Sequence, residues 1–275
     1  MSAAAFDAVA AEYDRDFTAT PLARALREQV WARLAMHFKA GDRALELNCG
    51  TGEDAIWLAQ RGVRITATDV STAMLNATER KARDGDVSDL IETSVLDLAS
   101  PPGPLSRNRT AHFERGGEAV RFDGVFSNFG GLNCVHDSRP LATFLADTIK
   151  PQGQLILAPM NRWCGWEIAW HVLHAQFRTA FRRLGRDGVE ANIGCDTVHV
   201  WYPSIRILRQ TFAPQFRLKR VIGLGVWLPP SYLEPVIAKR PKLFRWLQRF
   251  DQLTRDRWPL SHWADHVILE FERVA

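Results

Sequence analysis

The sequence predicts an α/β fold, a doubly wound, Rossmann-like and mostly parallel seven-stranded sheet with helical cap inserts near the C-terminal half. Short β-type runs alternate with helical segments along the chain, and no internal repeat interrupts them. Such alternation is typical of parallel sheets covered by helices on both faces. With 275 residues, 46% of them hydrophobic and 24% charged, the chain can bury a large core.

The N-terminal half contains the most regular alternation of strands and helices. A helix is predicted over residues 22–38 and ends before Gly41, because glycine favours helix termini. Another helix is expected at 71–83, where the hydroxyl of Ser71 can cap its first turn. Strands are expected at residues 43–48, 64–69, 90–97, 122–129, 154–160, 216–225 and 266–274, and further helices at 53–61 and 141–150.

One domain is expected over residues 1–275, with two long inserts beside the last strands. The predicted core covers about 40–160 together with 203–226 and 264–275, and the inserts are 161–202 and 227–263. Eight of the ten tryptophans follow residue 160: Trp163, Trp166, Trp170, Trp201, Trp227, Trp246, Trp258 and Trp263. Helical spacing predicts one helix over 163–184, and we expect most of these rings in the core and a few against an acceptor.

Charge and cysteine usage narrow the function classes. The net charge of +4 is too small to indicate nucleic acid without a concentrated basic patch. The four cysteines lack a CxxC pair, so neither a zinc site nor a disulfide framework is expected, and no metal is predicted. No apolar stretch approaches the roughly 18–20 residues that span a bilayer. These features favour a cytoplasmic protein.

A glycine turn follows the first predicted strand, with Gly50 and Gly52 preceded by Glu46. Glycine allows a ligand to approach the backbone closely. Asp69 ends the next strand, where its carboxylate can accept hydrogen bonds from ribose hydroxyls. The pattern also fits a dinucleotide fingerprint, but Glu46, Glu53 and Asp54 would repel a diphosphate at the helix N-terminus. They suit a ligand with a positive amino or sulfonium group.

These motifs resemble those of the class I S-adenosylmethionine-dependent methyltransferases, in their small-molecule branch, and the resemblance covers nearly the whole chain. Asn48 departs from the first motif, where the family usually has glycine. The resemblance implies S-adenosylmethionine as cofactor and S-adenosylhomocysteine as product. It implies cofactor contacts from Tyr13, Glu46, Asn48, Cys49, Gly50, Gly52, Asp69, Val70, Met74, Asp97, Leu98, Ser127 and Asn128. Of these, Asp69 would hold the ribose, Asp97 the adenine amino group, and Ser127–Asn128 the methionine moiety.

Candidates for a general base or an acceptor contact are His136, His199 and Tyr202. His136 follows the fourth predicted strand, where it could take a proton from an acceptor. The alternative interpretation is a surface histidine bonded to Asp137. His199 and Tyr202 lie before the sixth strand, and chain alternation directs only one of such neighbours inward. Methyl transfer requires mainly alignment and exclusion of water, so no catalytic triad is expected.

We therefore expect methyl transfer to a small, aromatic or lipophilic acceptor through an oxygen, nitrogen or carbon nucleophile. A methyltransferase for RNA or protein is an alternative, since Arg178, Arg182, Arg183 and Arg186, and separately residues 239–249, could form phosphate-binding faces. A cofactor-binding but catalytically silent subunit is another. Tryptophan and arginine within 163–184 leave peripheral membrane contact open. The sequence does not indicate the oligomeric state.

Overall fold

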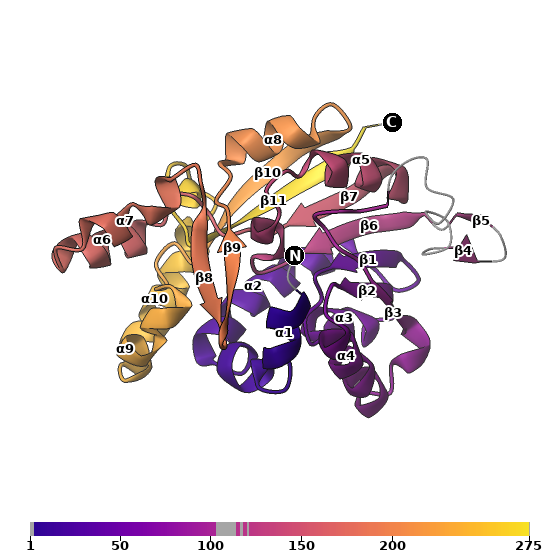
Figure 1. Ribbon diagram of the computed structural model, residues 1–275, viewed down its shortest axis with the longest axis horizontal. Coiled ribbons are helices and arrows are strands. Elements are labelled where there is room, and N and C mark those ends of the chain that lie inside the picture. The colour runs from indigo at the N-terminus through magenta and orange to yellow at the C-terminus, as the bar shows by residue number, and fades with distance from the viewer. Residues whose placement is uncertain (1–2, 103–113, 116–117, 120, 275) are drawn as a thin grey trace.

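The computed structural model describes residues 3–102, 114–115, 118–119 and 121–274. Seven strands form one sheet (Figure 1). In spatial order they are β10 (Phe216–Leu224), β11 (His266–Arg273), β7 (Ile149–Leu157), β6 (Phe122–Ser127), β1 (Arg43–Leu47), β2 (Arg64–Asp69) and β3 (Ile91–Val95). The strands from β7 to β3 pair in parallel, whereas β11 runs antiparallel to β7 and β10. The predicted mostly parallel seven-stranded sheet is confirmed.

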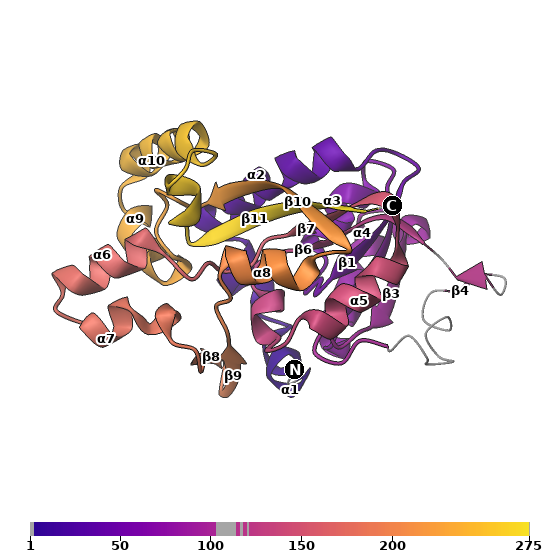
Figure 2. The same cartoon turned by 90° about the horizontal axis from the view of Figure 1, so that it is seen from above.

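Helices cover both faces of this sheet (Figures 1 and 2). One face carries α2 (Pro21–His37), α3 (Glu53–Ala59) and α4 (Thr72–Asp84), and the other carries α5 (Arg139–Thr148) and α8 (Ile205–Phe212). Thr20 accepts a hydrogen bond from the backbone N–H of Ala23 at the start of α2, and Ser71 accepts one from Met74 at the start of α4. These caps satisfy N–H groups that a helix leaves free at its N-terminus.

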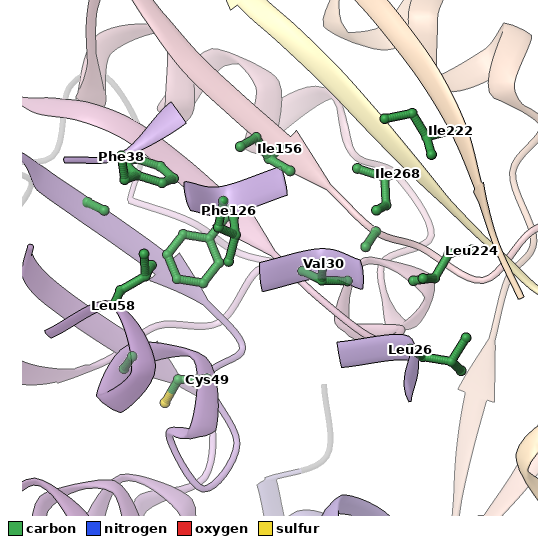
Figure 3. Close-up of a cluster of buried hydrophobic side chains, with 14 of the residues drawn as sticks. Leu26, Val30, Phe38, Cys49, Leu58, Phe126, Ile156, Ile222, Leu224 and Ile268 are labelled. Atoms are coloured by element: carbon green, nitrogen blue, oxygen red, sulfur yellow. The ribbon is translucent and has the colours of Figure 1, made fainter. Parts of the chain in front are cut away.

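Alternating strand residues divide the core into two clusters. Phe126 of β6 and Ile156 of β7 lie in one cluster with Val30 of α2, as Figure 3 shows. Their neighbours Val125 and Leu155 belong to the cluster beneath α5 and α8. Successive side chains of a strand lie on opposite faces, so both faces of these central strands are buried.

The strand order reverses between β1 and β6, because β2 and β3 lie on one side of β1 and β6 lies on the other. In an open α/β sheet, ligands bind outside the carboxyl ends of the strands at such a point. The fold therefore directs the search for a site to the loops after β1, β2, β6 and β7.

The insert 161–202 differs from its prediction. The single helix expected over 163–184 is wrong: α6 (Gly165–Leu173) ends before Ala175, whose φ of 58° is left-handed. The chain continues through α7 (Phe177–Ala180), the 3-10 turn η4 (Arg182–Leu184) and a hairpin of β8 (Val189–Ile193) and β9 (Asp196–Val200) that the sequence analysis did not predict.

The second insert contains α9 (Glu234–Ala238) and α10 (Pro241–Thr254), preceded by η5 (Ser231–Leu233) and followed by η6 (Leu260–His262). The remaining short elements are α1 (Ala3–Val9), the π-helical turn η1 (Asp14–Thr18), η2 (Ser88–Leu90), β4 (Glu114–Arg115), β5 (Glu118–Ala119) and η3 (Gly131–Cys134). Among the described residues, no helix combines the length and the apolarity needed to cross a bilayer.

Candidate functional site

The glycine turn after β1 packs against the end of β2. Gly50 has a φ of 55° and donates its N–H to Asp69 Oδ2 at 2.9 Å, and Asp69 Oδ1 accepts from the N–H of Ser71 at 3.0 Å. A side chain at Gly52 would collide with Thr78, because a Cβ there would lie 2.6 Å from its Cγ2. The turn therefore needs glycine at position 52 both for its φ of 81° and for space.

The N-terminal segment lies over this turn. Asp7 on α1 accepts hydrogen bonds from Ser71 Oγ (2.5 Å) and from the N–H of Ala73 (3.1 Å) at the start of α4. Tyr13 lies against Gly50, where a Cβ would be 3.9 Å from Tyr13 Cε1. Asp14 accepts from Thr51 Oγ1 at 2.5 Å. The N-terminal residues are thus bonded to the loops that the resemblance assigns to the cofactor.

Asn48 connects the ends of β1 and β6. Its φ is 51°, a left-handed conformation that asparagine tolerates better than most residues. Its Oδ1 accepts from Ser127 Oγ at 2.6 Å, and its Nδ2 donates to the carbonyl of Asn128 at 2.8 Å. The amide occupies space beside Gly131, where a Cβ would overlap it. Asn48, which stands where the resembling family usually has glycine, therefore lacks the backbone flexibility of glycine but forms two side-chain hydrogen bonds to the end of β6.

Two of the three carboxylates expected to face the ligand have basic partners. Glu53 pairs with Lys81 Nζ at 2.5 Å, which also lies 2.6 Å from Asp14, and Asp54 pairs with Arg27 at 2.8 Å. The sequence did not reveal these distant cations, which reduce the repulsion that Glu53 and Asp54 would exert on a diphosphate. The charge argument against a dinucleotide therefore depends on Glu46.

Glu46 is buried and lacks a full set of partners. It is 2% exposed, and its Oε2 has no hydrogen-bond partner among the described residues. Burial, reinforced by the nearby carboxylates of Asp54 and Asp69, raises its pKa well above the ordinary value of 4.5, although Arg27 opposes this. An incompletely satisfied buried carboxylate is costly, so it indicates a place for a hydrogen-bond donor or a cation.

Arg27 of α2 is a site residue that sequence reasoning missed. Its guanidinium is buried, lies 4.9 Å from the centroid of the Phe129 ring and has an unpaired Nε. Asn128, which follows β6, donates to Asp54 Oδ2 at 2.9 Å and keeps a buried, unpaired Oδ1. The end of β1 and the loop after it thus lie near one cation, Arg27, and two unsatisfied acceptors, Glu46 Oε2 and Asn128 Oδ1.

This donor set fits S-adenosylmethionine. Glu46 Oε2 and Asn128 Oδ1 can accept from an ammonium group, while Arg27 offers a positive charge for a carboxylate. Asp69 accepts backbone hydrogen bonds from Gly50 and Ser71, and its carboxylate has further lone pairs that can accept from ribose hydroxyls. Asp97 lies just after β3 and accepts from the N–H of Ala99. Polar groups at the carboxyl ends of β1, β2, β3 and β6, together with Arg27 of α2, are therefore chemically compatible with the two ends of this ligand.

The other predicted cofactor contacts are less directly placed. Val70 is half-buried after β2, whereas Cys49, Met74 and Leu98 are buried in the protein interior. Burial raises the pKa of the Cys49 thiol well above its usual range, so this thiol stays neutral. These four residues remain predictions as ligand contacts, and their burial shows at least a packing role.

The predicted acceptor residues do not form one cluster. His136 and His199 are both exposed and flank Trp201, with ring centroids 5.1 and 4.4 Å from it. His199 bonds through Nε2 to the carbonyl of Asp187. The alternative bond from His136 to Asp137 is not formed; Asp137 pairs with Arg139, which lowers its pKa to about 2. Tyr202 instead lies inward, with the guanidinium of Arg183 5.1 Å from its ring centroid.

His266, which the sequence analysis did not single out, lies beside Phe129 in the loop after β6. It begins β11, forms a bridge with Met160 after β7, and places its ring 5.7 Å from that of Phe129. Its Nδ1 lies 2.9 Å from Asp265 Oδ2. No motif identifies it, because its position depends on antiparallel pairing between distant segments. The Asp265-His266 pair before an apolar strand was the only available signal.

Buried ion pairs hold Asp265 in place. Its Oδ1 accepts from Arg183 at 2.7 Å, and Arg183 also bonds to Glu167 at 2.7 Å. Burial alone would disfavour its charge, but Arg183 and His266 hold the pKa of Asp265 far below its ordinary value. Arg182 pairs with Glu167 as well, so two of the four arginines expected to face phosphate are committed internally.

Comparison with known proteins finds similar chains. A family model described as "Methyltransferase domain" matches residues 45–155. The demethylmenaquinone methyltransferase of Clavibacter sepedonicus is 28% identical over 158 residues, which are 58% of this chain and 57% of that protein. The enzyme of the same name from Mycobacterium sp. (strain KMS) is 35% identical over 167 residues, 58% of this chain and 61% of that protein. The chain spans less than two thirds of these curated relatives.

The solved structure of the CcbJ methyltransferase from Streptomyces caelestis gives a TM-score of 0.59 at 14% identity, covering 97% of this chain and 96% of that one. At this identity the likeness shows the fold alone. The domain match begins in β1 and ends in β7, so it includes the glycine turn, Asp69 and Asn128. Residues 45–155 therefore match a methyltransferase domain, and the chain as a whole has the fold of the solved methyltransferase.

Proposed function

We propose that this protein transfers the methyl group of S-adenosylmethionine to a small aromatic or lipophilic acceptor and releases S-adenosylhomocysteine. The observation that carries the proposal is the unsatisfied Glu46–Asn128 pair, which lies within one connected cluster with Arg27 and the Phe129 ring. The matched relatives named demethylmenaquinone methyltransferases support a quinone-like acceptor.

On the cofactor side, Glu46 and Asn128 would bind the ammonium group and Arg27 the carboxylate of the methionine moiety. Asp69 would hold the ribose, Asp97 the adenine amino group, and Tyr13 would cover the glycine turn. When bound, the cofactor supplies a methyl group already activated by its sulfonium. The chain then needs to align a nucleophile with that group and to exclude water.

On the acceptor side, Phe129 and His266 face each other across the ends of β6 and the start of β11. Phe129 has a φ of 51°, a strained conformation for an aromatic residue, which supports a functional reason for its placement. A proton on the acceptor could pass to His266 Nε2, and the Asp265 carboxylate, 2.9 Å from Nδ1, would stabilise the protonated ring. Tyr202 would line the same side from the 161–202 insert.

The insert 161–202 would thus select the acceptor and contribute little to cofactor affinity. Its buried arginine Arg183 bonds to Asp265, whose Oδ2 lies 2.9 Å from His266 Nδ1, so the insert would support the proposed base. In the first of the two basic groups that could have faced RNA, Arg182 and Arg183 are paired internally, which weakens the case for that group.

The test combines binding with product identification. We expect calorimetry to show S-adenosylhomocysteine binding and much weaker NAD binding. Incubation with methyl-deuterated S-adenosylmethionine and either demethylmenaquinol or a quinone-containing lipid extract should give a deuterated product by mass spectrometry. Asp69→Ala, which loses charge-assisted hydrogen bonds, should weaken cofactor binding at least about tenfold and serve as the inactive control. Cofactor binding without any methylated product would instead support the silent-subunit alternative.

A further inference from the structure

Helix α10 presents an apolar stripe to solvent. Leu243, Trp246, Phe250 and Leu253 are 39%, 58%, 36% and 72% exposed. Their spacing of three, four and three residues places them on one side of the helix. We call these four side chains the α10 stripe. Exposed apolar side chains grouped in this way, rather than scattered, mark an interaction surface.

A row of cations borders the stripe. Lys242, Arg245 and Arg249 are exposed and repeat at the same helical spacing, on the flank of the stripe that faces away from the core. None of the three forms an ion pair within the described part of the chain. Lys239 and Arg240, just before the helix, are exposed as well. The surface therefore combines apolar area with uncompensated positive charge.

The opposite face of α10 is fixed to the protein. Asp251 is fully buried and accepts hydrogen bonds from Gln29 Nε2 and from the N–H of Trp227, both at 3.0 Å. Leu247 packs in the main core cluster. Trp246 and Phe250 stack on each other with centroids 5.3 Å apart. Because the inner face is anchored by these contacts, the stripe is held outward rather than waiting to fold inward.

We propose that the α10 stripe docks the protein on an anionic lipid bilayer. Aromatic and leucine side chains can enter the boundary between head groups and acyl chains, while the flanking lysine and arginines pair with lipid phosphates. A second copy of this chain fits less well, because two such faces would bring rows of like charge together. A nucleic acid would satisfy the cations but leave Leu243 and Leu253 in water.

The position of the α10 stripe, at one end of the molecule, agrees with docking on a bilayer. Both views place α9 and α10 at the same end of the molecule as α6 and α7 (Figures 1 and 2). That end also carries Leu173 (83% exposed) and Phe177 (58%). The surface differs from the one expected from the sequence: Arg182 and Arg183 of the 163–184 segment are paired with Glu167, so they are not free to hold lipid phosphates.

The test is vesicle co-sedimentation of the whole chain without cofactor or acceptor, so that its outcome is independent of the proposed methyl transfer. We expect binding to vesicles of equal parts phosphatidylcholine and phosphatidylglycerol, and at least about tenfold weaker binding to phosphatidylcholine alone or in high salt. The double variant Trp246→Gln/Leu253→Gln should weaken binding at least about tenfold, and Arg245→Gln/Arg249→Gln should remove the preference for the anionic vesicles.

Helix α8 offers matched controls, because it carries one exposed isoleucine, Ile207, between the exposed Arg206 and Arg209. Ile207→Gln and Arg206→Gln/Arg209→Gln should leave vesicle binding unchanged. Thermal unfolding checks that every variant is folded. Absence of vesicle binding, equal binding by the stripe variants, or a self-association that the stripe variants abolish in place of vesicle binding would each overturn the proposal. Binding to single-stranded RNA but not to vesicles would do the same.

Discussion

Two regions of the molecule bury carboxylates in opposite ways. At the end of β1, Glu46 has an unpaired oxygen and no direct cation, although Arg27 is near. At the start of β11, Asp265 lies between Arg183 and His266, and Glu167 is paired with Arg182 and Arg183. Both regions are buried, so burial alone does not distinguish a ligand site from a structural one.

The difference lies in how completely the charge is compensated. The Asp265 centre is satisfied by the chain itself and holds the 161–202 insert on the sheet. The Glu46 centre is left incomplete, which costs stability and reserves hydrogen-bonding capacity for a ligand. Their pKa values move accordingly, upward for Glu46 and downward for Asp265. Each of the following variants tests one side of this comparison.

The largest effect is expected from Arg183→Met, which leaves Glu167 and Asp265 buried with fewer partners. Removing one partner of a buried ion pair typically costs about 3–5 kcal/mol. Denaturant titration should therefore show a large loss in the free energy of unfolding. Arg178→Met, at an exposed position of the same insert, is the control and should change it by less than about 0.5 kcal/mol. A small loss in Arg183→Met would show that these charges are not a structural centre.

Glu46→Gln should raise the stability of the protein and lower its affinity for S-adenosylhomocysteine. The amide removes the cost of a buried, partly unsatisfied charge, so we expect a higher melting temperature. It also removes a charge-assisted contact with an ammonium group, worth about 1.5–3 kcal/mol, so the dissociation constant for S-adenosylhomocysteine should rise about tenfold or more. A variant that is less stable and binds normally would contradict the assignment of Glu46 to the ligand.

The dependence of binding and stability on pH should differ between the regions. The folded-state pKa of Glu46 is raised, so its contribution to stability is present below 4.5 and is lost as pH rises through the folded value. As pH rises from 4.5 through the folded-state pKa of Glu46, S-adenosylhomocysteine should bind more tightly, because its ammonium group needs the ionised carboxylate. For Asp265 the pKa is lowered, and stability is lost as pH falls below its ordinary value of 3.8. Calorimetry in two buffers should detect proton release on binding, and Glu46→Gln should abolish it.

The smallest effect is expected from His199→Ala. The ring is exposed, and its Nε2 bonds to the carbonyl of Asp187 just before β8. Its loss should therefore change turnover and cofactor affinity by no more than about twofold, which is below about 0.5 kcal/mol. In contrast, His266→Ala should slow turnover on the acceptor while leaving cofactor affinity unchanged. Steady-state rates and calorimetry measure both. Equal loss of turnover in the two variants would return His199 to the site, as the sequence suggested.

Local patterns predicted the sheet well, because strand and helix periodicity, the Ser71 cap and the glycine turn each depend on residues that are close together in the sequence. They failed where distant segments decide the structure. The break after Leu173 accompanies the burial of Arg183 against Asp265, which is 82 residues away. Arg27 joins the site through Asp54, and His266 through its bridge with Met160. Neither has a motif, because the partner that places each one lies elsewhere in the chain.

The tryptophans illustrate the same limit. We expected most of the eight later rings in the core, yet none is buried and Trp163, Trp246, Trp258 and Trp263 are exposed. A ring at helical spacing is equally compatible with an inward or an outward stripe, since the period does not identify the buried side. Only the anchoring of Asp251 and Leu247 decides which way α10 faces.

The contact between Asn48 and Gly131 couples substitutions at two positions. With asparagine at 48, alanine at 131 would overlap its amide, whereas glycine at 48 would leave room for it. Gly131→Ala should therefore be tolerated better together with Asn48→Gly than alone, so that the two substitutions are epistatic. Asn48→Gly alone would remove the two side-chain bonds that join the ends of β1 and β6.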